Sequence, residues 1–174
     1  MSETETIRAR TTSAAETAKL AAALGAAATA GDLLLLSGDL GAGKTVFAQG
    51  FGSGLGVTEP IVSPTFTLVR EYPGRVKLYH LDVYRLTHVQ EALDLGLAEL
   101  LDDDAVTLIE WGEQILPALP ADYLEVIVEL GDELDDERWF HLTAVGPRWS
   151  ARARGLARLL APWASDPGDS EATA

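Results

Sequence analysis

The stretch Leu33-Leu-Leu-Leu36-Ser-Gly38-Asp-Leu-Gly-Ala-Gly-Lys-Thr45 decides the fold of this 174-residue chain. Its four consecutive leucines lie between Gly31 and Gly38, a pattern typical of a strand buried on both faces of a parallel sheet. A glycine-rich loop follows at once, and the residues from Val46 to about Leu55 are predicted to form a helix. The stretch therefore predicts a strand, a loop and a helix in series, which is a building unit of α/β domains.

The loop matches the pattern G-x-x-x-x-G-K-[ST] at every fixed position, and its strand and helix neighbours are those that the motif requires. Glycines let the backbone approach phosphates, and the N–H groups at a helix start attract anions. A purely structural turn would leave a lysine at a helix start without a partner, which is electrostatically unfavourable. We predict that Lys44 reaches the β- and γ-phosphates and that Thr45 ligates Mg²⁺. The predicted binding residues for a nucleoside triphosphate are Asp39, Leu40, Gly41, Ala42, Gly43, Lys44 and Thr45.

Two other predicted strands end on a carboxylate. Asp82 ends the run that begins at Val76, and Glu110 ends the run that begins at Ala105. A phosphate-loop enzyme needs a carboxylate at the carboxyl end of a neighbouring strand, to hold hydrated Mg²⁺ or to orient the attacking water. For each residue alone, a solvated carboxylate at a strand end remains the alternative interpretation.

Thr65 and Trp111 are less specific candidates. Thr65 belongs to Ser63-Pro-Thr-Phe66, where a switch segment would bring a hydroxyl near the metal or the γ-phosphate. Ser-Pro is also a common turn initiator, so that both interpretations stay open. Trp111 follows Glu110 directly, and it either stacks near the nucleotide or fills the core.

The rest of the chain alternates between helical and strand patterns, beginning with a capping box at Ser13 and Glu16. The other predicted elements are a helix to about Ala28, a hairpin of Thr67–Tyr72 and Val76–Val83, a helix over Leu86–Leu101 interrupted at Gly96, a strand pair Tyr123–Leu130 and Arg138–Val145, and a helix over Trp149–Leu160. This order predicts a three-layer α/β fold of the P-loop NTPase type, with a mixed, mainly parallel sheet and antiparallel hairpins. We expect a single domain over residues 1–164 and a disordered tail over residues 165–174.

Composition excludes several classes of function. The net charge of −14, from 27 acidic and 13 basic residues, disfavours direct binding to RNA, DNA or anionic lipid. The chain has no cysteine and three scattered histidines, so a disulfide framework and a zinc site are not expected. The start of the chain lacks a secretory pattern, and no run of about 18 apolar residues occurs, which predicts a cytosolic protein without a membrane segment. The acidic charge favours either solubility or a charged docking face.

Four motif blocks in this order and spacing resemble the TsaE family, the small ATPases of bacterial tRNA threonylcarbamoyladenosine biosynthesis. The blocks are the phosphate loop Gly38–Thr45, Ser63-Pro-Thr-Phe-Thr-Leu-Val69, Tyr79-His-Leu-Asp-Val-Tyr-Arg-Leu86 and Ile109-Glu-Trp-Gly112. The resemblance extends over roughly residues 10–145. It implies ATP as the nucleotide, and the chain has no Asn-Lys-x-Asp motif for guanine.

The resemblance also implies residue roles and partners. Lys44 and Thr45 would bind phosphate and Mg²⁺, Asp82 would be the metal-associated carboxylate, and Glu110 with Trp111 would form the catalytic and nucleotide-adjacent region, with Glu110 also a candidate metal ligand. Thr65 would act as a switch residue. The family role is accessory: the protein joins TsaD and TsaB and reaches tRNA only through that complex.

Two other functions remain as alternatives. A small P-loop kinase would share the size and fold, but no arginine-rich lid is visible in the sequence. A nucleotide-gated scaffold would bind the nucleotide with negligible hydrolysis and shift between docked and free states. Because no arginine finger is evident in the chain, we expect slow hydrolysis by the protein alone.

Overall fold

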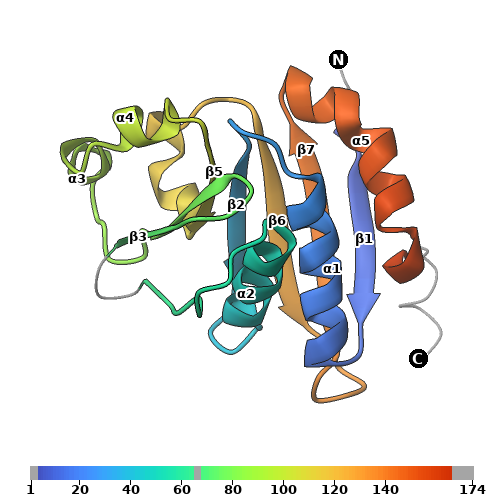
Figure 1. Cartoon of the computed structure of the whole chain (residues 1–174). Helices are drawn as coiled ribbons and strands as arrows, with labels where there is room; N and C mark the ends of the chain where they lie inside the picture. Colours follow the sequence, from blue (N-terminus) through green and yellow to red (C-terminus); the bar gives the residue numbers. More distant parts are fainter. Residues whose placement is uncertain (1–3, 65–67, 166–174) are drawn as a thin grey trace.

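The structure is a computed structural model that describes residues 4–64 and 68–165. Within these residues, seven strands form one sheet in the order β1-β7-β6-β2-β5-β4-β3 (Figure 1). The four central strands, β6, β2, β5 and β4, are mutually parallel, while β1, β7 and β3 pair antiparallel with their neighbours. The strands are β1 (Thr6–Thr11), β2 (Leu33–Gly38), β3 (Val69–Tyr72), β4 (Lys77–Asp82), β5 (Ala105–Glu110), β6 (Tyr123–Leu130) and β7 (Arg138–Val145).

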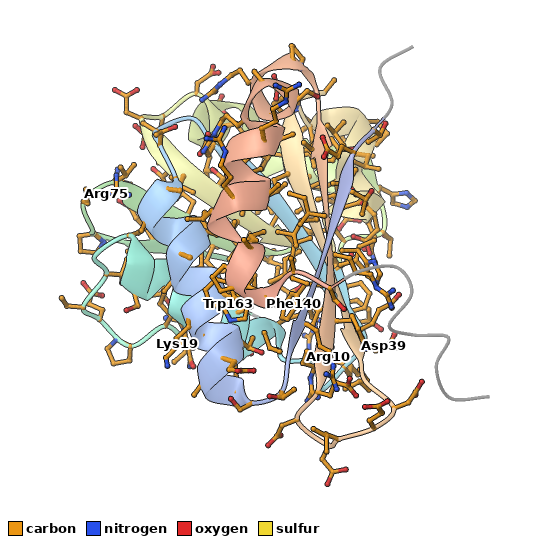
Figure 2. The ribbon with its side chains drawn as sticks, turned by 90° about the vertical axis from the view of Figure 1, so that its right-hand side faces the viewer. Arg10, Lys19, Asp39, Arg75, Phe140 and Trp163 are labelled. Atoms are coloured by element: carbon orange, nitrogen blue, oxygen red, sulfur yellow. The ribbon has the colours of Figure 1, made fainter. Side chains whose placement is uncertain are left out.

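Helices cover both faces of the sheet. One face carries α1 (Ala14–Ala27), α2 (Lys44–Gly54) and α5 (Pro147–Leu159), and the other carries α3 (Val89–Asp94), α4 (Leu97–Leu101) and the 3₁₀ helix η1 (Gly112–Ala118) (Figure 1). A second 3₁₀ helix, η2 (Ala161–Trp163), follows α5. Figure 2 shows the sheet nearly edge-on, with Phe140 of β7 and Trp163 of η2 on the side of the sheet that α1 and α5 cover. The predicted α/β fold with a mixed sheet and antiparallel hairpins is confirmed.

The leucine run of β2 contributes to two hydrophobic cores. Leu34 and Leu36 belong to the core beneath α1, α2 and α5, whereas Leu33 and Leu35 belong to the core beneath α3, α4 and η1. Successive side chains of a strand point to opposite faces, so a strand buried on both faces has no polar side. The continuous apolar run is therefore the sequence signature of the central strand in a three-layer fold.

The first predicted helix begins at its predicted cap. Ser13 Oγ accepts a hydrogen bond from the Glu16 backbone N–H at 3.1 Å, and Glu16 Oε2 accepts from the Thr12 backbone N–H at 2.7 Å. The first bond satisfies a donor that the helix start leaves without a helical acceptor, and the second ties the residue before the cap to the first turn. The helix after the phosphate loop begins at Lys44, two residues earlier than predicted, so Lys44 and Thr45 lie in its first turn.

Several elements differ from the predictions. Strand β1 and the 3₁₀ helices were not predicted, and the helix expected over Leu86–Leu101 is two short helices separated by Gly96, whose φ is +79°. The disordered tail expected over residues 165–174 stays a prediction, because residues 166–174 lie outside the described residues; Ser165 donates a backbone hydrogen bond to the Arg8 carbonyl at 3.1 Å. None of the helices in the described parts of the chain combines the length and the apolar character that crossing a membrane requires.

Candidate functional site

The loop between β2 and α2 has the backbone conformation that its glycines predict. Gly41 and Gly43 have φ angles of +81° and +98°, in the left-handed region that glycine adopts without strain. Gly38 lies so close to β6 that an added Cβ would be 2.5 Å from the Val128 carbonyl oxygen. The loop thus leads directly into the first turn of α2, where N–H groups without helical acceptors and the positive end of the helix dipole attract anions.

Lys44 is nearly buried, and its ammonium contacts the loop itself. Nζ donates to the carbonyl oxygens of Gly38 and Asp39, the latter at 3.3 Å, and it lies 4.4 Å from the centre of the Trp111 ring. An anionic phosphate oxygen attracts an ammonium by its full charge in addition to the hydrogen bond, whereas a carbonyl oxygen offers only a partial charge. Phosphate oxygens are therefore better partners for this ammonium than the neutral carbonyls that it contacts here.

Asp82 and Glu110 lie side by side at the carboxyl ends of two parallel strands. They are register partners in the pairing of β4 with β5, and Glu110 is also the partner of Leu36 in β2, just before the phosphate loop. Both carboxylates are buried. Asp82 Oδ1 accepts from the Tyr84 backbone N–H at 2.9 Å, while Glu110 Oε2 lies 3.1 Å from Nε2 of His80.

Trp111 is held in an unusual backbone conformation. Its φ and ψ are +64° and +28°, the left-handed region, which is rare for a bulky residue and costs about 1–3 kcal/mol. Its backbone N–H donates to the Leu36 carbonyl at 3.1 Å. The centre of its ring lies 5.0 Å from the centre of the ring of the exposed Tyr84. The strained turn places the indole beside the phosphate loop.

These residues surround one cavity of about 310 Å³. It is lined by Asp39, Leu40, Gly41, Gly43, Lys44, Thr45, Val46, Ser63, Asp82, Glu110 and Trp111. Of the predicted site residues, Ala42 is fully buried within the loop and does not line the cavity. Thr65 lies outside the described residues, so its predicted role has no structural counterpart here.

The polar side chains of the cavity suit Mg²⁺. The predicted ligands Thr45, Asp82 and Glu110 offer only hydroxyl and carboxylate oxygens, which are the ligands that this hard cation prefers. In residues 4–64 and 68–165, no group of three or more histidine, aspartate or glutamate side chains is arranged to hold a metal ion. A magnesium ion bound with a nucleotide needs only one or two protein ligands besides phosphate oxygens and water.

Sequence reasoning missed two residues that support the site. Arg138, at the start of β7, donates from Nε to the Ala42 carbonyl at 2.9 Å and from Nη2 to the Gly41 carbonyl at 3.4 Å. It therefore holds the phosphate loop from a strand that is 96 residues away along the chain. His80 contacts Glu110 from the middle of β4. Residues two apart in a strand face the same side of the sheet, so the spacing of His80 and Asp82 was the one sequence signal that placed His80 on the side of the site.

The comparison with protein families gives a match over most of the chain. Residues 11–138 match the family described as threonylcarbamoyl adenosine biosynthesis protein TsaE. The matched region contains every predicted site residue and ends at Arg138.

Individual relatives agree with this match. The tRNA threonylcarbamoyladenosine biosynthesis protein TsaE of Bacillus subtilis (strain 168) is 44% identical over 150 residues, which are 86% of this chain and 92% of that protein. The protein of the same name from Nostoc sp. is 50% identical over 122 residues, covering 67% of this chain and 74% of the relative. The crystal structure of YdiB from Bacillus subtilis aligns with a TM-score of 0.78 at 40% identity, covering 91% of this chain and 98% of the other.

Proposed function

Because this chain belongs to the TsaE family of threonylcarbamoyl adenosine biosynthesis proteins, we propose that it serves this tRNA modification in the cytosol as an ATPase. The observation that carries the proposal is the cavity that is lined by the lysine Lys44 and by the carboxylates of Asp82 and Glu110. An ammonium at a helix start binds phosphates, and carboxylates at neighbouring strand ends serve a metal ion and a water molecule. ATP is the proposed nucleotide, with Mg²⁺ as its companion ion.

In the proposed reaction, water attacks the γ-phosphorus and the bond to the β,γ-bridging oxygen breaks, giving ADP and inorganic phosphate. Lys44 and the loop N–H groups hold the phosphates, and Glu110 orients the attacking water. Thr45 and Asp82 would hold Mg²⁺, and the bound ion would supply positive charge to neutralise the phosphate oxygens. Trp111 lies beside the nucleotide, and Thr65 acts as a switch residue.

We further propose that the protein acts with TsaD and TsaB and that docking completes its site. Arg138 lies against the phosphate loop, but its guanidinium is engaged by carbonyls of the loop and of Asp135 and Glu137. An arginine that reaches the transferred phosphoryl group is worth about 10³ to 10⁵ in rate. Hydrolysis by the chain alone is therefore expected to be slow, and a partner is expected to accelerate it.

The test is phosphate release from ATP by the protein alone and then with TsaD plus TsaB. Wild type is compared with Lys44→Ala and Asp82→Ala. Lys19→Ala and Asp104→Ala serve as matched controls because both residues are exposed and neither lines the cavity. Partner-stimulated hydrolysis that is lost in the first pair and kept in the second is the expected result.

The alternatives give different results in the same assay. Nucleotide binding without turnover in the full mixture would contradict the ATPase proposal and favour a nucleotide-gated scaffold. Appearance of a phosphorylated small molecule would instead indicate a kinase.

A further inference from the structure

His80 lies in the middle of β4 and is 1% exposed. Its register partners are Leu108 in β5 and Arg70 in β3, and Leu78 precedes it by two residues on the same face of β4. A histidine that is buried this fully needs hydrogen bonds to compensate for its lost hydration. One such hydrogen bond joins its Nε2 to Glu110 Oε2, 3.1 Å away.

The second nitrogen of the ring determines how this contact works. His80 Nδ1 is buried and has no hydrogen-bond partner among the residues that the structure describes. A buried N–H without an acceptor is rarer and more costly than an unused acceptor lone pair, so the proton belongs on Nε2 and Nδ1 carries the lone pair. With the proton on Nε2, the imidazole donates this N–H to the Glu110 carboxylate.

The two carboxylates of the cavity are therefore oriented by different donors. Asp82 is held by a backbone N–H of the same chain segment, that of Tyr84, which any residue type at position 84 except proline would supply. Glu110 is held by a side chain of the neighbouring strand, and its bond therefore depends on the residue at position 80. Glutamate has one more rotatable bond than aspartate, so its carboxylate needs the additional constraint more.

We propose that His80 is a positioning residue that fixes the Glu110 carboxylate, holding Oε2 so that the group keeps one orientation toward the cavity. This inference rests on the proposed hydrolysis, in which Glu110 orients the attacking water. A carboxylate that rotates freely spends only part of its time in the productive geometry, and loss of such a supporting hydrogen bond typically lowers activity about 10- to 100-fold. His80 itself touches neither nucleotide nor water in this scheme.

Two substitutions separate the hydrogen bond from the bulk of the ring. In His80→Gln the amide nitrogen takes a position like that of Nε2 and can still donate to Glu110. In His80→Asn the amide is one bond shorter and corresponds to the Nδ1 position, from which it cannot reach the carboxylate. We expect His80→Asn to lower kcat about 10- to 100-fold with the nucleotide Kd changed less than about threefold, and His80→Gln to keep most of the activity.

A double substitution tests whether His80 acts through Glu110. Adding His80→Asn to Glu110→Gln is expected to lower kcat no further, because the group that His80 orients has already been replaced. Equal losses in the Gln and Asn variants, a parallel loss of nucleotide affinity, or a full additional loss in the double variant would each overturn the proposal. Thermal unfolding of every variant identifies any that fails to fold.

The hydrogen bond has a readout that is independent of hydrolysis. In the ¹⁵N spectrum of the histidine imidazoles, we expect the proton of His80 on Nε2, slow to exchange, with a chemical shift that moves in Glu110→Gln and stays in Asp82→Asn. A proton on Nδ1, or rapid exchange at Nε2, would overturn the assignment. A protein that hydrolyses no ATP in any mixture would refute the proposed function, while this spectrum would still decide whether His80 holds Glu110.

Discussion

The ammonium of Lys44 can contact either the carbonyls of its own loop or a bound phosphate, but not both at once. Here it is bonded to loop carbonyls and lies over the ring of Trp111. A bound phosphate would draw it away, because a charged acceptor is the stronger partner. We expect a saturable change in tryptophan fluorescence when a non-hydrolysable ATP analogue with Mg²⁺ is titrated. The change should vanish in Trp111→Phe and persist in Trp163→Phe, and its persistence in Trp111→Phe would contradict this arrangement.

Glu137 gives the protein a pH-dependent contribution to stability. Burial raises its pKa, but the 2.5 Å bond from Arg10 Nε and the backbone N–H of Glu133 outweigh burial, so the pKa lies below its usual value. A carboxyl group whose pKa is depressed on folding stabilises the native state above its unfolded pKa of about 4.3, and this contribution is lost as the pH falls through the lower folded value.

We therefore expect Glu137→Gln to lower the free energy of unfolding at pH 7 by about 1.5–3 kcal/mol, as for a lost hydrogen bond to a charged group. The difference from wild type should shrink as the pH falls below about 4.3. Urea unfolding at several pH values between 7 and 3 measures it. Glu133→Gln is the control, since its exposed pair with Arg10 contributes about 1 kcal/mol or less. A difference that is constant with pH would refute the assignment.

The residues of the site were predictable to the extent that each follows from a local pattern. The phosphate loop is continuous in sequence, and Asp82 and Glu110 each end an apolar strand, so they could be proposed without knowing that they are register partners. Arg138 and His80 could not, because their partners lie 96 and 30 residues away along the chain. Hydrogen bonds of this kind follow from the order of strands in the sheet, which local periodicity does not determine.

Among the elements, α1 and α2 approach unusually closely. An added Cβ at Gly50 would lie 2.4 Å from the Ala18 carbonyl oxygen, and one at Gly54 would lie 2.1 Å from that of Ala22. From the other side, a Cβ at Gly25 would lie 2.1 Å from the Phe51 carbonyl oxygen. Backbone atoms cannot move aside as a flexible side chain can. These three glycines therefore fix the distance between α1 and the helix that begins with Lys44.

We expect Gly50→Ala to lower the free energy of unfolding by about 1–3 kcal/mol, as overpacking does, and to weaken nucleotide binding because α2 shifts. Gly155→Ala in α5 is the matched control: nothing lies within 4 Å of its added Cβ, and alanine should stabilise that helix by about 0.5–1 kcal/mol. Denaturant unfolding and nucleotide titration of both variants measure the difference. Equal stabilisation by the two alanines would show that the close approach is not needed.

The spacing of apolar residues predicted the strands and helices that have a clear apolar pattern, and it missed the elements that lack such a pattern. Strands β6 and β7 have the predicted bounds because buried and partly exposed residues alternate along both. In β1 the buried positions include Ala9 and Thr11, which carry little hydrophobic signal, and the outward positions hold Arg8 and Arg10. Arg8 lies 4.2 Å above the ring of Trp139 in β7, a contact between segments far apart along the chain that no local pattern indicates.

At the scale of the whole molecule, the net charge of −14 is unevenly distributed. Helix α5 carries four arginines and no acidic residue, whereas residues 89–104 carry six acidic residues and no basic one. In Figure 1 these segments lie at opposite sides of the molecule, with α3 and α4 at one end and α5 at the other. The net charge of the sequence predicts an acidic protein but not this separation of basic and acidic segments. Such a separation orients a charged partner more strongly than net charge alone.

Asp32 attaches the arginine-rich helix, which lies beyond the region matched to the family, to the start of the central strand. Its buried carboxylate accepts from Arg152 at 2.8 Å, from Arg148 at 3.3 Å and from the Thr29 backbone N–H at 2.9 Å.

We expect Asp32→Asn to lower the free energy of unfolding by about 1–3 kcal/mol, because the buried carboxylate loses its charge-assisted hydrogen bonds. Arg148→Ala should cost about 1 kcal/mol or less, since that side chain is half exposed. Urea unfolding measures both, and nucleotide titration of the folded variants should give unchanged affinity, because α5 supports the sheet and does not line the cavity. Equal costs for the two variants, or weaker nucleotide binding by folded Asp32→Asn, would contradict this role.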